Sequence, residues 1–234
     1  QYETRARNRS RMRALTAPQE TPVTVRTILQ LCADTGSDTW PYRLDPKYEV
    51  ITIGADIGVE NYHPDRPIHG IIANPVCTEF SRVRRGKPGQ NYPHESDPEK
   101  GMFLVRECQR VIEEAQPQWW AIENPATGSL RDHLGKPDFS YQPWQFGSPW
   151  TKLTGLWGNF NKPSPTYTDW DDVPDKIGLW ARPGRKPSIV YLHKSAFNLI
   201  PEFRYSGMPA PTTDAELRSL CSQGFARAFK EANP

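Results

Sequence analysis

Two short stretches of the sequence place a nucleophile and an acid after apolar segments. Cys77 lies in "NPVCTEFS" (74–81), directly after the apolar segment 68–73, and Glu123 follows the apolar segment 119–122. A thiolate can add to an electron-poor carbon while a carboxylic acid protonates or hydrogen-bonds the group that accepts the charge. Taken singly, a cysteine after a strand is more often a structural residue, and a Glu-Asn-Pro sequence is often only a turn. Together they favour covalent catalysis.

The segments around these residues have the pattern of an α/β sheet. Short apolar or β-branched runs predict strands at 25–31, 49–53, 68–73 and 119–122. Apolar residues at three- and four-residue spacing from about 99 to 116 predict a helix that Pro117 ends. Strand, helix and strand with short connections predict a βαβ unit in a mainly parallel sheet. Cys77 and Glu123 would then meet at the carboxyl edge, where such sheets bind ligands.

The first 24 residues differ in composition from the rest of the chain. Arginines occupy every second position of the arm, at Arg5, Arg7, Arg9, Arg11 and Arg13, and a Pro/Thr-rich spacer follows. Such a segment cannot bury a core, so we expect residues 1–24 to be flexible on their own. Two interpretations stay open: a solvated tail, or an arm that becomes ordered against nucleic-acid phosphates.

The remaining chain divides into three parts. We expect an α/β domain at 25–160, and an irregular insert at 161–211 that is rich in Pro, Trp and charge. Residues 212–234 carry a capping box from Thr213 to Glu216 and a helical apolar pattern, which predicts one C-terminal helix that packs back on the α/β domain.

Composition narrows the classes of protein that fit. No apolar run reaches the roughly 18 residues that a membrane span needs. The 4 cysteines are dispersed without a Cys-x-x-Cys pair, which favours reduced thiols in a cytoplasm over a disulfide framework. The 5 histidines do not lie at zinc-ligand spacing near any cysteine, so we expect no metal site.

Five segments together resemble the DNA cytosine-C5 methyltransferases. "NPVCTEFS" resembles the Pro-Pro-Cys-x-x-Phe-Ser nucleophile loop of that family, and "WAIENPATG" resembles its Glu-Asn-Val/Pro motif. "QFGSPWTKLTGLWGNF" (145–160) is similar to the later Tyr-Gly-x-Pro-x-x-Arg motif in the form found in short phage-encoded members. "ILQLCADTGSDTWPY" (28–42) occupies the place of the first cofactor motif, and "LCSQGFARAFKEAN" resembles the C-terminal segment of the short members. Their order and rough spacing agree with the family.

The resemblance implies a Rossmann-like methyltransferase fold with a mostly parallel central sheet flanked by helices and a small irregular recognition insert. It also implies that a target cytosine is flipped out of DNA into the crevice. Cys77 would add to C6, and Glu123 would hold N3 and the exocyclic amine. Asn124 would support the nucleophile loop, and Lys152, at the position of the motif's arginine, would bind the base carbonyl or a phosphate. The activated C5 would take a methyl group from S-adenosylmethionine.

The resemblance further implies two sets of binding residues. The residues that would bind the cofactor are Asp34, Thr35, Gly36, Ser37, Asp56, Asn74 and Pro75. The residues that would contact DNA are Ser81, Arg82, Arg84 and Arg85 in a mobile loop, together with the arginines of the arm. A solvated basic loop is the alternative interpretation of the second set.

The cofactor half departs from the family pattern. Cys32 stands in place of an aromatic residue, Asp34 in place of the first glycine, and Gly54 where the family has an acid. Asp56, two residues later, is then the acid available for a ribose or adenine. Four functions follow in order: a phage-type methyltransferase in DNA modification or evasion of host restriction; a pyrimidine-modifying enzyme with the same Cys/Glu pair and another donor; a non-catalytic DNA- or partner-binding relative; and an amino-group methyltransferase. The last ranks low because Cys77 stands where that chemistry needs an aromatic ring. We expect DNA as partner, no membrane and the cytoplasm (of the host, if phage-encoded), and we leave the oligomeric state open.

Overall fold

A mixed sheet of six strands forms the centre of the molecule. The computed structural model describes residues 24–33, 35–81, 97–174, 176 and 178–234. The strands are β1 (Arg26–Leu31), β2 (Tyr48–Ile53), β3 (Gly70–Ala73), β4 (Trp119–Pro125), β5 (Phe139–Tyr141) and β6 (Thr154–Asn159), in the order β2-β1-β3-β4-β6-β5. Neighbours among β1 to β4 are parallel, whereas β6 is antiparallel to both β4 and β5. The fold is therefore the mostly parallel, Rossmann-like α/β arrangement that the sequence predicts.

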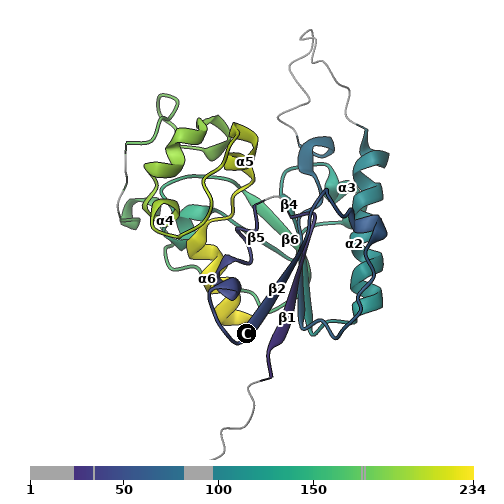
Figure 1. The fold of residues 1–234 in the computed structure, drawn as a ribbon. Coiled ribbons are helices and arrows are strands. Elements are labelled where there is room, and N and C mark those ends of the chain that lie inside the picture. The colour runs from purple at the N-terminus through teal and green to yellow at the C-terminus, as the bar shows by residue number, and fades with distance from the viewer. Residues whose placement is uncertain (1–23, 34, 82–96, 175, 177) are drawn as a thin grey trace, which may run out of the picture.

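Helices cover both faces of this sheet (Figure 1). One face carries α2 (Pro98–Ala115) and α3 (Leu130–Leu134); the other carries α1 (Trp40–Arg43), α4 (Pro201–Arg204), α5 (Asp214–Ser219) and α6 (Gln223–Ala232). Because side chains alternate along a strand, Leu29 packs with the α2 side while Ile28 packs with the α6 side. Burial on both faces explains why the parallel strands are apolar runs rather than alternating ones.

The predicted βαβ unit is confirmed as β3, α2 and β4, whose outer strands are parallel neighbours. Asp97 caps α2, accepting a hydrogen bond from the Lys100 N–H at 3.1 Å. The connection from β2 to β3 holds only the 3-10 turn η1 (Val59–Asn61), and α1 is a single short turn. The sheet thus lacks full helices beside β1 and β2, as the short spacing before Pro75 indicates.

The hairpin of β5 and β6 was not predicted from the sequence. Its residues fall within or near segment 145–160, which shows no simple alternation and contains Gly155 and Gly158. A Cβ on Gly158 would lie 2.1 Å from the carbonyl oxygen of Trp120, so the strand approaches β4 only because this residue is glycine.

The prediction of one C-terminal helix is wrong, because the segment forms two helices, α5 and α6. Ser222 starts the second helix: its hydroxyl accepts a hydrogen bond from the Phe225 N–H at 3.2 Å. Thr213 caps α5 as expected, but the Glu216 carboxylate accepts from Thr212 at 2.6 Å instead of closing the box on Thr213. The break lets α6 pack on the sheet while Leu217 of α5 packs on the insert.

The insert has a small core of its own beside the sheet. It contains η5 (Trp170–Asp172), η6 (Ile189–Tyr191), η7 (Lys194–Asn198) and α4. Buried Glu202 of α4 joins it to the rest, accepting from Trp150 Nε1 at 3.0 Å and from the Gln223 N–H at 2.9 Å. Burial raises the pKa of Glu202, and these donors offset part of that cost. Within the described ranges, no helix is long and apolar enough to cross a bilayer.

Candidate active site at the carboxyl edge of the sheet

Cys77 begins the 3-10 turn η2 (Cys77–Glu79), which follows β3 after the linker 74–76. Its side chain is exposed instead of filling the core. The Cys77 carbonyl accepts hydrogen bonds from the N–H groups of Phe80 and Ser81 at 3.1 and 2.9 Å, and these close the turn. The interpretation of Cys77 as a buried filler is therefore wrong, and the turn presents the thiol at the surface.

Phe80 anchors this turn in the core. Its ring is fully buried and packs with Met102 and Val105 of α2 and with Leu130 of α3. A Cβ on Gly101 would lie 2.7 Å from Phe80 Cζ, so the helix approaches the ring as closely as a glycine allows. The position of Cys77 thus depends on a well-packed contact three residues later.

Asn124 ties the linker before Cys77 to β4. The side chain is fully buried, and Nδ2 donates a 2.9 Å hydrogen bond to the carbonyl oxygen of Pro75. Its Oδ1 is also buried and has no hydrogen-bond partner among the described residues. Gly155 lies opposite Asn124 in the β4–β6 ladder.

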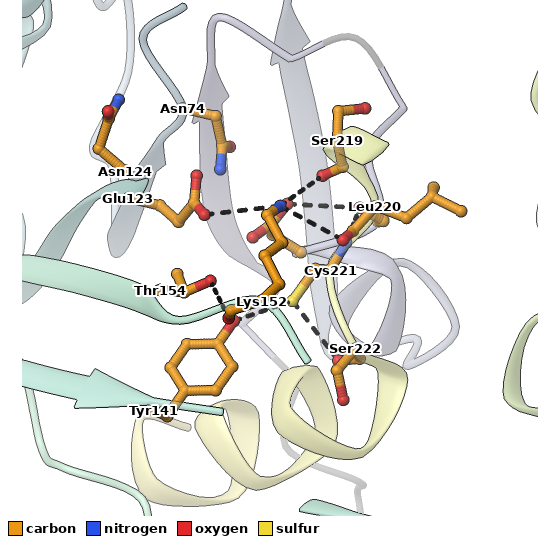
Figure 2. Close-up of polar contacts among 12 residues, drawn as sticks. Asn74, Glu123, Asn124, Tyr141, Lys152, Thr154, Ser219, Leu220, Cys221 and Ser222 are labelled. Atoms are coloured by element: carbon orange, nitrogen blue, oxygen red, sulfur yellow. Dashed lines mark hydrogen bonds and ion pairs between the residues drawn. The ribbon is translucent and has the colours of Figure 1, made fainter. Parts of the chain in front are cut away.

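Glu123 points away from Asn124, as successive residues of a strand do, and pairs with Lys152. Glu123 Oε1 lies 3.8 Å from Lys152 Nζ, and both side chains are mostly buried, with 15% and 17% exposure. Lys152 Nζ also donates to the carbonyl oxygens of Ser219 and Leu220, at 3.4 and 3.5 Å. Figure 2 shows the ammonium between the carboxylate and these carbonyls. Because water screens such a pair poorly, its charges act strongly on one another.

The electrostatics connect this pair to the thiol. Burial alone would lower the pKa of Lys152, but the nearby groups Glu123, Cys77 and Asp38 outweigh it and raise that pKa. Lys152 is therefore a cation at neutral pH. The structure brings Cys77, Glu123 and Lys152 into one electrostatic cluster, with Asn124 beneath it.

The ends of β1, β2 and β3 converge at the predicted cofactor region. Ala33 N–H donates to the Ile53 carbonyl at 3.1 Å, and Asn74 N–H donates to the Leu31 carbonyl at 3.0 Å. The exposed residue Asp56 folds back here, since a Cβ on Gly54 would lie 3.0 Å from its Oδ1.

The turn after β1 places its predicted residues differently. Gly36 has a φ of 67°, which suits glycine, whereas Asp34 lies outside the described residues. Ser37 is fully buried, and its hydroxyl accepts from the Cys221 N–H at 2.9 Å. The same hydroxyl accepts from Thr35 at 3.1 Å. Ser37 thus holds the C-terminal segment in place.

The predicted DNA contacts fall largely outside the described residues: Arg5, Arg7, Arg9, Arg11, Arg13, Arg82, Arg84 and Arg85. Ser81 is described and lies partly buried at the end of the nucleophile turn.

The insert offers a surface that the sequence did not single out. We define the insert surface as Trp180, Arg182 and Tyr191. The Arg182 guanidinium lies 4.3 Å from the Tyr191 ring centroid, and the two aromatic rings lie 6.3 Å apart. Trp180 and Tyr191 are 57% and 47% exposed. Ser188 bridges to Thr151, directly before Lys152, which connects this part of the insert to the site.

Sequence reasoning also missed Asp38 and the carbonyls of Ser219 and Leu220. Carbonyl groups carry no sequence signal, and Asp38 lies within the "TGSDTW" motif segment without being part of the family pattern. Within the described ranges, no cluster of three or more His, Cys, Asp or Glu residues has metal-binding geometry.

Comparison with known proteins gives one similar sequence and one similar structure. No family model matches the chain. A curated protein of Frog virus 3 (isolate Goorha), named "Probable DNA (cytosine-5)-methyltransferase", is 29% identical over 98 residues, which are 37% of this chain and 44% of that protein. The match therefore spans less than half of the relative's length. A crystal structure described as a candidate DNA modification methyltransferase from an E. coli prophage has 15% identity and a TM-score of 0.39 over 57% of this chain and 46% of its own.

Proposed function

We propose that this chain is a DNA cytosine-C5 methyltransferase that uses Cys77 as a covalent nucleophile. The observation that carries the proposal is the cluster at the carboxyl edge: an exposed Cys77 next to the Lys152 cation, whose ammonium lies 3.8 Å from Glu123 Oε1. The similarity to the Frog virus 3 protein supports the family. A non-catalytic binding protein would have no need for this combination of thiol, acid and cation.

The reaction begins with the thiolate of Cys77. The Lys152 ammonium favours the thiolate over the thiol, since a nearby cation stabilises the anion. The thiolate forms a bond to C6 of a cytosine flipped out of the duplex. Electrons of the C5–C6 double bond move toward N3, and Glu123 gives N3 a proton. After C5 is methylated, loss of its proton expels the thiolate.

Asn124 holds the nucleophile in place during these steps. Its hydrogen bond to the Pro75 carbonyl fixes the linker from below, while the buried Phe80 ring fixes the turn from the other end. A nucleophile held at both ends keeps its approach to the base narrow, which lowers the entropic part of the barrier.

S-adenosylmethionine supplies the methyl group when it is bound. The residues present fit such a ligand in part. The exposed Asp56 carboxylate beside the ends of β1 and β2 suits ribose hydroxyls, and the left-handed Gly36 turn lets a ligand approach the backbone. Asn74 and Pro75 lie at the adjoining end of β3. Ser37 is committed to the C-terminal segment, so its role is to shape the turn.

DNA would lie across the carboxyl edge, with the insert surface on one side. Aromatic rings stack on bases and guanidinium groups pair with phosphates, which suits the composition of Trp180, Arg182 and Tyr191. The basic segments around Arg84 and in the N-terminal arm belong to the same proposal as phosphate contacts. A phage origin and a role in restriction evasion stay part of it.

The test of the covalent step is trapping on DNA that contains 5-fluorocytosine, with S-adenosylmethionine present. Fluorine at C5 cannot leave as a proton does, so the Cys77–C6 bond persists and the complex survives denaturing electrophoresis. We expect the adduct in the wild type and in the control Cys108→Ala, and its loss in Cys77→Ala. Absence of an adduct in the wild type would sink the proposal.

A second candidate keeps the Cys77 and Glu123 chemistry with a different donor. Two features of the first cofactor turn favour it: Cys32 replaces the family's aromatic residue, and the Ser37 hydroxyl is already engaged by Cys221. Calorimetry with S-adenosylmethionine separates the two candidates. Binding supports the methyltransferase, whereas trapping on a modified pyrimidine without any cofactor binding supports the other donor.

A further inference from the structure

Asp38 is a buried carboxyl beside the candidate site, in the turn between β1 and α1. It is only 9% exposed, and its Oδ2 accepts a weak hydrogen bond from the Ser37 hydroxyl at 3.4 Å. The side chain borders a cavity of about 10 Å³ whose other lining residues are apolar: Ile72, Ala121, Leu156, Phe225 and Phe229. A carboxylate in such surroundings is costly unless a cation or hydrogen-bond donors compensate it.

Groups from five parts of the fold face this carboxyl. They are Asn74 after β3, Glu123 of β4, Tyr141 of β5, Lys152 before β6, and Cys221 between α5 and α6. Burial and the adjacent Glu123 raise the pKa of Asp38 to about 6, while Lys152 and hydrogen bonds from Cys221 and Asn74 act in the opposite direction. Lys152 in turn interacts with Glu123, Cys77, Asp38 and Cys221.

The cluster therefore sets one ammonium against two carboxyl groups. Lys152 by itself would favour the ionised form of Glu123 and so oppose its carrying a proton. A second negative charge on the same ammonium offsets this effect. The only carboxyl that the described residues place there, besides Glu123 itself, is Asp38.

We propose that Asp38 is a positioning residue of this site: its carboxylate balances the Lys152 ammonium and so keeps Glu123 able to carry the proton that the pyrimidine ring accepts. This inference rests on the proposed function. In the addition step the S–C6 bond forms, the ring electrons move to N3, and the proton passes from Glu123 to N3. Glu123 is left as a carboxylate beside Lys152, and it takes the proton back when the thiolate leaves. Asp38 keeps its own charge throughout.

The kinetic test is the variant Asp38→Asn, which removes the charge and keeps the size. We expect the alkaline limb of the kcat–pH profile to move to lower pH by about one unit, so that kcat at pH 8 falls about tenfold. The KM for DNA stays unchanged because Asp38 does not touch the substrate. The matched control is Glu202→Gln, another buried carboxyl, which is bonded to Trp150 and to the start of α6. Its profile should superimpose on that of the wild type. An Asp38→Asn profile that superimposes as well would overturn the proposal.

A second measurement needs neither methylation nor the Asp38 variant. Carbon-13 NMR of the labelled Asp38 carboxyl reports its titration directly in the protein alone. Its midpoint should move to lower pH in Glu123→Gln, which removes a negative neighbour, and to higher pH in Lys152→Met, which removes the cation. A midpoint that is the same in both variants as in the wild type contradicts the coupling.

The two sets of results separate the possible failures. Shifted midpoints in a wild type that forms no adduct with DNA would leave the charge coupling intact and refute the proposed function. Adduct formation with unshifted midpoints would refute the role of Asp38 alone.

Discussion

The Nδ2 atom of Asn124 donates a 2.9 Å hydrogen bond to the carbonyl oxygen of Pro75, and so a strand interior holds the chain two residues before the candidate nucleophile. Replacing Asn124 by Ala leaves a buried carbonyl unpaired. We expect a loss of roughly 1 to 3 kcal/mol in unfolding free energy and a fall in kcat of at least about tenfold. Urea unfolding and single-turnover methylation measure the two effects.

Asn61 provides the control for this hydrogen bond. Its Nδ2 also donates to a backbone carbonyl, that of Ile57, at 2.9 Å, but in an exposed position away from the site. Asn61→Ala should change both stability and kcat little. Equal losses in the two variants would show that the Asn124 bond has no special relation to the nucleophile.

The contact of Gly101 with Phe80 gives the second prediction. Gly101→Ala in the helix interior would ordinarily stabilise the helix by up to about 1 kcal/mol. Here the new methyl group would lie 2.7 Å from Phe80 Cζ, so the fully buried ring must shift. We expect a net destabilisation of about 1 to 3 kcal/mol together with slower alkylation of Cys77 by iodoacetamide if the turn is displaced from Lys152.

Gly178→Ala is the comparison for this variant, because its added Cβ meets nothing within 4 Å. Its alkylation rate and midpoint of thermal unfolding should match the wild type. A Gly101→Ala protein with raised stability and an unchanged Cys77 would contradict the account of how the turn is anchored.

The third prediction concerns pH. The folded-state pKa of Asp38 is raised from 3.8 to about 6, so between these values the folded protein binds a proton that the unfolded chain has lost. The stability contributed by protonated Asp38 is complete below pH 4 and is lost as pH rises through about 6. The total change is roughly 3 kcal/mol, because each pH unit between the two pKa values contributes about 1.4 kcal/mol.

Because many groups titrate in this range, the quantity to measure is the difference between wild type and Asp38→Asn. Urea unfolding at pH 4 and pH 7.5 should show the wild type losing stability relative to the variant as pH rises. A constant difference across this range would mean that Asp38 titrates normally. This prediction tests burial of the carboxyl alone and does not depend on any catalytic role.

The insert surface gives the fourth prediction. Tyr191→Ala removes a ring that lies under the Arg182 guanidinium, and it should weaken binding of a short duplex by about 5- to 100-fold. The control is Tyr205→Ala. Tyr205 is 76% exposed and lies 5.3 Å from the Arg204 guanidinium, but it borders a different cavity, with Trp40 and Tyr48 near the amino end of β2. Fluorescence anisotropy at fixed salt should register a loss for Tyr191→Ala only; equal losses would assign the effect to general surface charge.

The sequence predicts the elements whose burial follows a simple rule. The four parallel strands are continuous apolar runs, and α2 repeats its apolar residues at helical spacing, so both are visible without a partner element. The hairpin of β5 and β6 was missed because its strand identity depends on a close approach at Gly158, which only the neighbouring Trp120 carbonyl reveals.

The site divides along the same line. Cys77 and Glu123 come from short motifs, and their shared electrostatic cluster follows from the order of parallel strands. The surroundings of Asp38 do not, because they are built by residues remote in sequence: the Cys221 N–H that holds adjacent Ser37 is 184 residues away. Contacts of this range leave no local pattern that a reader of the sequence could follow.

The two reacting groups sit on backbone of unequal rigidity. Glu123 lies within β4, and its residue pairs with Leu156 of the hairpin, whereas Cys77 stands on a single 3-10 turn beyond the end of β3. Amide hydrogens near Glu123 should accordingly exchange with solvent far more slowly than those of residues 77–79. The acid is thus the fixed reference of the site, and any adjustment to a bound base falls to the thiol.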